Sequence, residues 1–298
     1  MGKDLPNAEN GNGTSPAAGL SGFAFIEGAS ASMRPVEAVI RELAQSEVPV
    51  LLLAERGAGK HATARRIHEM SRQSAQPFRA LPCSTLKPAD LAAPRGNGGA
   101  ALGQGTIYLE ELADLSADCQ AHLLESLPQA GGNGAGARPR ARLICGSARD
   151  LEVEVKAGRL REDLYYRISG VCLRLPPLRQ RREDIPVLMG HFLRKYAQDF
   201  HRAVPDLSAE TQHLFQDYSW PGNLRELENA ARVLVALGDE QVAMGGLRAL
   251  LRQPEPGSGR ISLKEASRAA SREAEKELIL KVLTRTRWNR RRAALPGR

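Results

Sequence analysis

The sequence predicts an α/β fold in which a parallel sheet with flanking helices is followed by a small all-helical part. Three observations support this prediction. Short apolar runs alternate with helical patterns in the first part of the chain, a glycine-rich turn joins one such run to a helix, and the pattern is all-helical after Pro177. Strands that are buried on both faces of a parallel sheet have nearly continuous apolar sequences, as these runs do. With 298 residues, of which 42% are hydrophobic, the chain can bury a core of this kind.

The predicted strands are the apolar runs, which lie at residues 48–54, 106–109, 142–147 and 171–175. Helical patterns lie between them, including residues 62–72 and 117–127. Because strands that are joined by helical crossovers pair in parallel, these segments predict a parallel sheet with helices on both faces. No apolar run approaches the roughly 18 residues that a membrane-spanning helix needs, so we expect no membrane contact.

The part of the chain after Pro177 predicts a small helical domain. One apolar stripe has residues three or four positions apart, namely Ile185, Leu188, Phe192 and Tyr196. Asn223 and Glu226 predict a capping pair at the start of a further helix, and Gly238 is placed to end that helix.

A glycine-rich turn between the first predicted strand and the following helix has the features of a phosphate-binding loop. It contains Glu55, Arg56, Gly57, Ala58, Gly59, Lys60 and His61. Backbone N–H groups of the turn and of the helix N-terminus can surround phosphates, and Lys60 can reach the terminal ones, so we predict ATP as the ligand. The match is incomplete, because Ala54 replaces the first glycine and His61 stands where Ser or Thr would help to hold magnesium. A glycine-rich turn without a ligand is the alternative.

Two carboxylates end the strand predicted at residues 106–109. A phosphate-binding enzyme needs one acid there to hold magnesium and one to polarise the attacking water, which predicts these roles for Glu110 and Glu111. The first acid is usually Asp, and Glu110 is longer by one methylene. A misplacement of about 1 Å can cost on the order of a hundredfold in rate. The alternative is a solvated pair of surface acids.

Four motifs in a fixed order resemble the central AAA+ domain of sigma-54-dependent transcriptional activators, the bacterial enhancer-binding proteins. They are ERGAGK (55–60), GRLREDLYYR (158–167), LPPLRQRREDIP (175–186) and WPGNLRELEN (220–229). The resemblance covers residues 25–251, and it implies a P-loop AAA+ sheet with flanking helices that is followed by a helical lid. It also implies ATP and magnesium as cofactors, and a homo-oligomeric ring or a mixed ring with related activators.

The resemblance implies roles for three arginines. In that family the second motif carries arginines that reach into the ATP site of the neighbouring subunit, and these match Arg161 and Arg167. The fourth motif carries the nucleotide-sensing arginine of the lid, which matches Arg225. A guanidinium suits these roles because its fixed donors complement phosphate oxygens. For Arg161 the alternative is a surface ion pair with a nearby acid such as Asp163.

Three departures from the family pattern predict a motor that is impaired in hydrolysis and in contact with sigma-54. The family carries a GAFTGA loop that contacts sigma-54, whereas residues 90–104 are shorter and lack this motif. The sensing Thr-Asn of the family aligns with Ser147 and Ala148, which removes an amide that could orient water. His61 replaces the family's Glu. We therefore expect sigma-54 RNA polymerase to be a poor partner.

The C-terminal segment resembles the start of the Fis-type helix-turn-helix with which these activators bind DNA, and it ends before a recognition helix. The formal net charge is +8, and six arginines and no acid lie in the last fourteen residues. Such a cluster predicts weak DNA contacts without sequence preference, through the phosphates. A solvated tail is the alternative.

Composition divides the chain into five segments. We predict a disordered leader at residues 1–21, the AAA+ α/β nucleotide-binding subdomain at 22–178, the helical lid subdomain at 179–251, a linker at 252–260 and the truncated helix-turn-helix-like segment at 261–298. The leader has no apolar signal core and the four cysteines form no CxxC pair, so we expect a cytoplasmic protein with reduced thiols.

These observations leave three functions to compare. We favour an ATP-binding transcription regulator of the sigma-54 activator type that is impaired as a motor. An active ATPase that remodels sigma-54 RNA polymerase would need a substitute for the missing loop. A weak, nonspecific DNA-binding relic would act through the C-terminal arginines alone.

Overall fold

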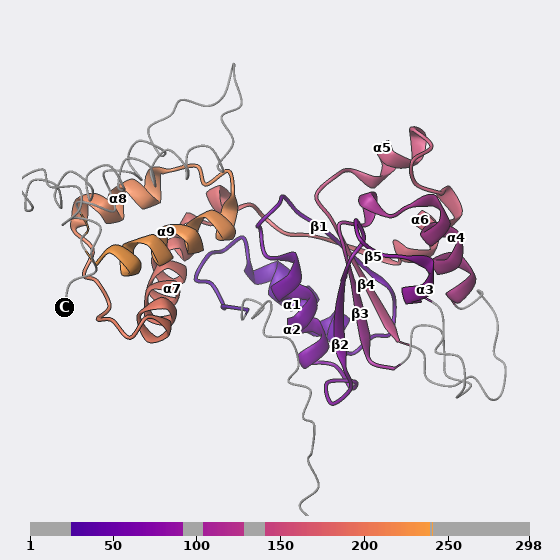
Figure 1. The fold of residues 1–298 in the computed structure, drawn as a ribbon, viewed down its shortest axis with the longest axis horizontal. Coiled ribbons are helices and arrows are strands. Elements are labelled where there is room, and N and C mark those ends of the chain that lie inside the picture. The colour runs from indigo at the N-terminus through magenta and orange to yellow at the C-terminus, as the bar shows by residue number, and fades with distance from the viewer. Residues whose placement is uncertain (1–24, 92–103, 128–140, 239, 241–298) are drawn as a thin grey trace, which may run out of the picture. The chain divides into compact units, whose positions relative to one another are not determined.

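The computed structural model describes residues 25–91, 104–127, 141–238 and 240, which form two compact units (Figure 1). Unit 1 contains the described residues up to Glu27 together with residues 34–175, and unit 2 contains residues 28–33 together with the described residues from Pro176 onward. Within these residues no helix is long and apolar enough to span a membrane. The segments predicted at 1–21, 252–260 and 261–298, and most of the loop at 90–104, lie outside the described part. The boundaries predicted for the α/β subdomain and the lid stay predictions.

Unit 1 is built on a five-stranded sheet whose strands are all parallel, in the order β2-β3-β4-β1-β5. The strands are β1 (Val50–Leu53), β2 (Phe78–Pro82), β3 (Thr106–Glu110), β4 (Arg142–Ser147) and β5 (Val171–Arg174). The predicted α/β fold with a parallel sheet is thereby confirmed. The apolar pattern does not predict β2, because this edge strand is partly exposed and its sequence FRALP contains an Arg and a Pro.

Helices cover both faces of this sheet (Figure 1). They are α1 (Arg34–Ala44), α2 (Lys60–Glu69), α3 (Pro88–Leu91), α4 (Ala117–Ser126), α5 (Leu151–Lys156) and α6 (Glu162–Ile168), with the 3-10 turn η1 (Leu112–Asp114) after β3. Helices α1 and α2 lie on one face and α3 to α6 on the other. On the second face, Ile107 and Leu109 of β3 pack with Leu123 of α4 and Leu164 of α6 in one buried cluster. Burial of each such side chain contributes about 1.5–3 kcal/mol, so this cluster holds the sheet rigid beneath its loops.

The face that α1 and α2 cover contains polar anchors as well as apolar ones. The buried side chain of Arg142 in β4 donates hydrogen bonds to the carbonyls of Leu43 and Ala44, at the C-terminal end of α1. Carbonyls at this end have no partner within the helix, and a cation there also complements the helix dipole. His68 of α2 shares a hydrogen bond of 2.9 Å with the hydroxyl of Thr106 in β3. These bonds fix α1 and α2 against the strands that carry the candidate site.

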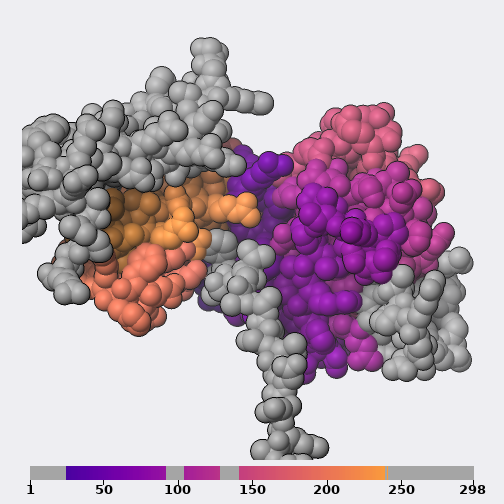
Figure 2. Space-filling model, viewed as in Figure 1, coloured from indigo at the N-terminus to yellow at the C-terminus, as the bar shows by residue number. Residues whose placement is uncertain are grey.

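The described part of unit 2 is helical. It contains α7 (Ile185–Asp199), α8 (Ala209–Asp217) and α9 (Asn223–Leu237), preceded by the 3-10 turns η2 (Leu178–Gln180) and η3 (Arg182–Asp184). Helix α7 packs against α9 (Figure 2). The predicted stripe lies on α7, where Ile185, Leu188 and Phe192 are buried, and the hydroxyl of Tyr196 donates to Glu228 of α9 at 2.8 Å. The prediction of a small all-helical part is confirmed.

The capping pair predicted for α9 is wrong in part. Glu226 accepts a hydrogen bond from the N–H of the N-cap residue Gly222 at 2.8 Å, as a capping acid does. Asn223, however, does not cap the helix, because its Oδ1 accepts from the backbone N–H of Leu178 at 2.7 Å and so connects η2 with α9. Asn223 has a φ of 53°, a left-handed conformation that Asn adopts more readily than most residues. At the other end Gly238, with a φ of 68°, ends α9 as predicted.

Candidate functional site

The candidate site lies at the carboxyl ends of β1, β4 and β3, which are adjacent in the sheet. The glycine-rich turn follows β1, and α2 begins at Lys60 with Gly59 as its N-cap. Gly57 and Gly59 have φ values of 78° and 109°, in a region that residues with a Cβ rarely adopt. A turn of this kind before a helix N-terminus presents backbone N–H groups to an anion. The predicted phosphate-binding turn therefore has the backbone that its function would require.

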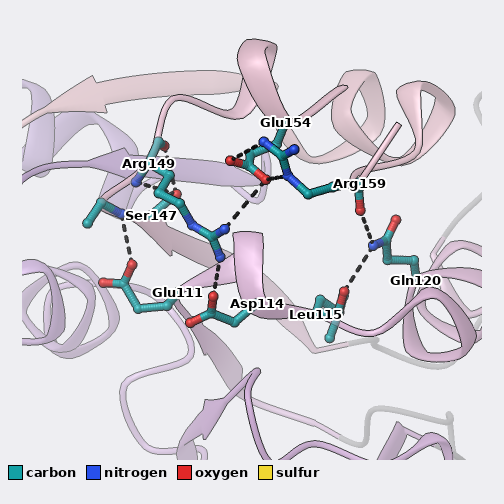
Figure 3. Close-up of polar contacts among 9 residues, drawn as sticks. Glu111, Asp114, Leu115, Gln120, Ser147, Arg149, Glu154 and Arg159 are labelled. Atoms are coloured by element: carbon teal, nitrogen blue, oxygen red, sulfur yellow. Dashed lines mark hydrogen bonds and ion pairs between the residues drawn. The ribbon is translucent and has the colours of Figure 1, made fainter. Parts of the chain in front are cut away.

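Lys60 connects the turn with the end of β3. Its Nζ donates to the carbonyl of Ala54 at 2.8 Å and lies 2.9 Å from Oε1 of Glu111. The other carboxylate oxygen of Glu111 accepts from the backbone N–H of Ala148, after β4, at 2.9 Å (Figure 3). The Lys60 side chain is only 7% exposed, so the carboxylate of Glu111 serves as the counter-ion of a largely buried ammonium. The structure thus brings together the predicted residues Lys60, Glu111 and Ala148.

The backbone around Glu111 and Ser147 fixes this arrangement. Glu111 has a φ of 54°, which is uncommon for a residue other than glycine, and the chain turns there from β3 into η1. Ser147 is buried, and its hydroxyl donates to the carbonyl of Arg149 at 2.8 Å. The carbonyl of Ser147 accepts from the N–H of Ala54 at 3.1 Å, which ties the end of β4 to the glycine-rich turn. Conformations that cost of order 1–3 kcal/mol and are held by such contacts are common at functional sites.

Glu110, the predicted magnesium ligand, faces His61. Oε1 of Glu110 lies 3.8 Å from Nε2 of His61, which is too far for a hydrogen bond. The imidazole ring lies edge-on to the rings of Phe78 and Tyr108, with centroid distances of 5.8 and 5.7 Å. Burial lowers the pKa of His61 against the raising effect of Glu110, and Arg65 adds to the lowering. The imidazole is therefore neutral near pH 7.

The donor groups fit the phosphates of a nucleotide better than they fit magnesium. The turn and Lys60 supply the N–H groups and the cation that phosphates need. Mg²⁺ prefers an octahedron of oxygen ligands, whereas the position after Lys60 supplies the imidazole of His61. Both oxygens of Glu111 already bond to other groups, as described above. Among the described residues of this site, Glu110 therefore remains as an oxygen ligand for Mg²⁺, and the other ligands would be phosphate and water oxygens.

The arginines that the family resemblance assigned to a neighbouring subunit lie at the two ends of α6. Arg161 immediately precedes this helix and Arg167 lies in its last turn. The guanidinium of Arg161 is 49% exposed and donates to both carboxylate oxygens of Asp163, at 3.0 and 2.7 Å. The ion pair that was the alternative for Arg161 thus forms within the chain, and it leaves the prediction of a role toward a neighbour untested. Arg225 is an exposed residue of α9, in unit 2.

Sequence reasoning missed a cluster of ion pairs beside the site (Figure 3). Arg149, next to Ala148, pairs with Asp114 of η1 and lies 3.5 Å from Glu154 of α5. Arg159 donates to the same carboxylate at 2.6 and 3.1 Å. The hydrogen bond from Arg159, helped by the charge of Arg149, lowers the pKa of the Glu154 carboxyl. No helical or strand spacing in the sequence predicts this cluster, because Asp114 lies in η1, Glu154 in α5 and both arginines in the segments that flank α5.

Sequence reasoning also missed Gln120, a buried residue of α4 that positions the segment before α6. Its amide Nε2 donates to the carbonyls of Leu115 and Arg159 at 3.0 and 2.9 Å (Figure 3). Its Oε1 accepts from the backbone N–H of Arg161 at 2.9 Å. The one hint in the sequence is an uncharged polar residue next to the buried Cys119. Gln120 therefore sets the backbone position of Arg161.

Comparisons with known protein families give two matches. Residues 28–178 match the family described as the sigma-54 interaction domain, and residues 179–262 match the AAA+ ATPase lid domain. The response regulator protein PilR of Pseudomonas aeruginosa is 35% identical over 290 residues, which are 90% of this chain and 65% of that protein. The transcriptional regulatory protein ZraR of Escherichia coli is 35% identical over 313 residues, which are 98% of this chain and 70% of that protein. The chain thus spans about two thirds of the length of these relatives.

Solved structures with the same fold include NtrX from Brucella abortus. The NtrX structure in complex with ADP has a TM-score of 0.66 and 27% identity, and it covers 91% of this chain and 66% of that chain. The complex with ATP has a TM-score of 0.65 and 26% identity, and it covers 91% and 65%. This likeness agrees with the parallel sheet and the helical unit described above.

Proposed function

This chain belongs to the family of sigma-54 interaction domains, and on that premise we propose that it is an ATP-binding transcription regulator of the sigma-54 activator type. In this proposal the chain binds ATP, hydrolyses it slowly, and assembles with further copies of itself or with related activators. The relative ZraR is a transcriptional regulatory protein and the NtrX structures hold ADP or ATP, which supports the proposal by analogy.

The observation that carries the proposal is the junction of Lys60, Glu111 and the N–H of Ala148 at the end of three strands. A buried ammonium beside a glycine-rich turn and a helix N-terminus is suited to the terminal phosphates of a nucleotide. A carboxylate 2.9 Å from that ammonium is suited to polarise a water next to the last phosphate. The site therefore has the groups that bind ATP, together with one of the groups that hydrolyse it.

We propose that hydrolysis is slow because of the side chains of Ala148 and Glu110. Ala148 has no side-chain amide to orient water, and its backbone N–H is bonded to the carboxylate that would polarise the water. Glu110 is one methylene longer than the Asp that usually holds the cation, and a displacement of about 1 Å can cost on the order of a hundredfold in rate. We therefore expect a turnover well below about one per second.

Nucleotide affinity tests the proposal directly. Titration with a fluorescent ADP analogue should give saturable binding to the wild type, and Lys60→Ala should abolish it, because the phosphates lose their one buried cation. Lys156→Ala is the matched control, since it removes the same charge from an exposed position on α5 of the same unit. Equal affinities for the wild type and Lys60→Ala would remove the basis of the assignment.

An active ATPase is the second candidate, and the exposure of Arg161 favours it. The guanidinium of Arg161 is 49% exposed, and its present partner is a surface carboxylate that a phosphate can replace. Steady-state ATP turnover, measured alongside binding, separates the two candidates, because a turnover of about one per second or more would indicate an active ATPase. Contacts with sigma-54 through residues 90–104, and with DNA through the C-terminal arginines, involve segments outside the described residues and stay predictions from the sequence.

A further inference from the structure

We propose that His61 and Glu110 bind one divalent transition-metal ion at the nucleotide site, so that this chain prefers Mn²⁺ to Mg²⁺ as the partner of its nucleotide. The proposal deepens the function proposed above and rests on it, because it concerns the cation that accompanies the phosphates. It rests on the placement of two side chains from different elements, in a position where a cation is expected and where an imidazole faces the carboxylate.

The side chains of His61 and Glu110 come from two different elements and face each other. His61 lies in the first turn of α2, directly after the lysine of the phosphate-binding turn, where many phosphate-binding loops carry a Ser or Thr that holds magnesium and the related activators carry a Glu. Glu110 is the last residue of β3, in the position of the carboxylate that holds magnesium. The side chains of His61 and Glu110 are 26% and 34% exposed, so solvent and ions reach both.

The separation of the two donor atoms suits a shared ion. His61 Nε2 and Glu110 Oε1 are 3.8 Å apart. Two ligands of one octahedral ion, each about 2.1 Å from it, lie about 3.0 Å apart when adjacent and about 4.2 Å apart when opposite. The observed distance falls between these values and exceeds that of a hydrogen bond. A small rotation of the Glu110 side chain would thus place both donor atoms at the spacing of two ligands of one ion, whose other ligands would be phosphate and water oxygens.

The chemistry of the ligands selects the ion. Carboxylate and water oxygens suit Mg²⁺ and Mn²⁺ alike, whereas an imidazole nitrogen suits transition metals and is a poor ligand for Mg²⁺. An imidazole in place of an oxygen ligand, either the hydroxyl of other phosphate-binding loops or the carboxylate of the related activators, therefore weakens Mg²⁺ binding relative to Mn²⁺ binding. Zn²⁺ also binds imidazole and carboxylate, but most of its protein sites use three or four such ligands, and among the described residues no group of three could hold a metal.

The ring of His61 is held in the orientation that this role needs. Its edge contacts with Phe78 of β2 and Tyr108 of β3 restrict rotation, and both rings belong to strands of the rigid sheet. The charged groups that face the imidazole are Glu110 from β3 and Arg65 from its own helix. The carboxylate therefore supplies the second ligand, and the aromatic contacts reduce the entropy that the imidazole would lose on binding a metal.

The test compares cations in the presence of nucleotide. ADP affinity is measured for the wild type with EDTA, with Mg²⁺ and with Mn²⁺, and again for His61→Thr, which supplies the hydroxyl instead of the imidazole. We expect ADP to bind the wild type at least about tenfold more tightly with Mn²⁺ than with Mg²⁺, and we expect this ratio to fall toward one in His61→Thr. Circular dichroism of both proteins checks that the variant is folded.

A spectroscopic readout tests the ligand itself. Pulsed electron paramagnetic resonance of Mn²⁺ bound to the wild type should show coupling to a ¹⁴N nucleus, which should disappear in His61→Thr. Nucleotide binding with equal affinities for Mn²⁺ and Mg²⁺, and no nitrogen coupling, would overturn the metal proposal and leave the proposed function intact. Absence of ADP binding with every cation would instead overturn the proposed function, and a nitrogen coupling from Mn²⁺ added alone would then still support the metal site.

Discussion

At the scale of single residues, the backbone of Ala148 makes one interaction of the site, while its side chain lacks the amide that a second interaction would need. The N–H of Ala148 orients the Glu111 carboxylate, but the methyl side chain cannot orient a water molecule. The variant that carries both Ala148→Asn and Glu110→Asp should therefore hydrolyse ATP faster than the wild type, by on the order of tenfold or more, because it restores an amide and a shorter cation ligand. Phosphate release under saturating ATP measures this. His122→Asn, an exposed change on α4, is the control, and an unchanged rate in the double variant would place the defect elsewhere.

The Glu154 carboxyl gives a second prediction at this scale, on stability and pH. Arg159 and Arg149 lower its pKa in the folded chain, so the folded state holds the charged form more strongly than the unfolded state does. The stabilisation is present above the pKa of the unfolded chain and is lost as the pH falls through the lowered pKa. Glu154→Gln should therefore lower the melting temperature at pH 7, and the difference from the wild type should shrink in acid. Glu125→Gln, at an exposed site on α4, should show no such dependence.

At the scale of secondary-structure elements, the side chain of Asn223 joins η2 to α9. Asn223→Ala would leave the buried N–H of Leu178 without this acceptor and would place Ala in a left-handed conformation. We expect a loss of about 1–3 kcal/mol in the free energy of unfolding of unit 2. Asn229→Ala, on the same helix, is the control because Asn229 accepts from the exposed side chain of Arg232. Denaturant unfolding of the two variants measures the difference, and equal losses would show that the bond to Leu178 contributes little.

The elements also show how far the sequence predicts the structure. Strand β4 was predicted with the bounds that it has, because its six residues are buried and its centre, from Leu143 to Cys145, is apolar. Lys60 and Glu111 could both be assigned to the nucleotide site in advance, since both follow the carboxyl ends of parallel strands, although β4 lies between these strands in the sheet. The contacts of Gln120 and of the Glu154 cluster could not be predicted, because Gln120 bonds to backbone groups, and the arginines that pair with Glu154 lie in irregular segments without a periodic spacing. Asn223 was misassigned because its spacing from Glu226 fits a local cap, whereas a tertiary contact uses its side chain.

At the scale of the whole molecule, the site on one chain is expected to need arginines from another. Arg161 bonds to Asp163 and Gln120 within its own chain, in the described structure. If it acts on a neighbour, any ATP turnover per chain should increase with chain concentration, and an excess of Arg161→Ala chains should suppress the wild type. Turnover per chain that stays constant on dilution would show that the neighbour is not required. Arg159→Ala, which breaks the pair with Glu154, is a control for loss of charge beside that position.

The ion pair between Lys60 and Glu111 affects the electrostatic free energy of nucleotide binding. Because the ammonium already has an anion 2.9 Å away, an incoming phosphate meets a neutralised lysine instead of a bare one. Binding then replaces one anion by another at the same cation, and the displaced carboxylate becomes free to face the last phosphate. The electrostatic gain on binding is the attraction of Lys60 to the phosphate minus its attraction to the Glu111 carboxylate, and these two energies are similar. Ionic strength should therefore influence nucleotide affinity less than the charge of ATP alone would suggest. Glu111, which follows β3, therefore competes with the phosphates of a nucleotide for the ammonium of Lys60.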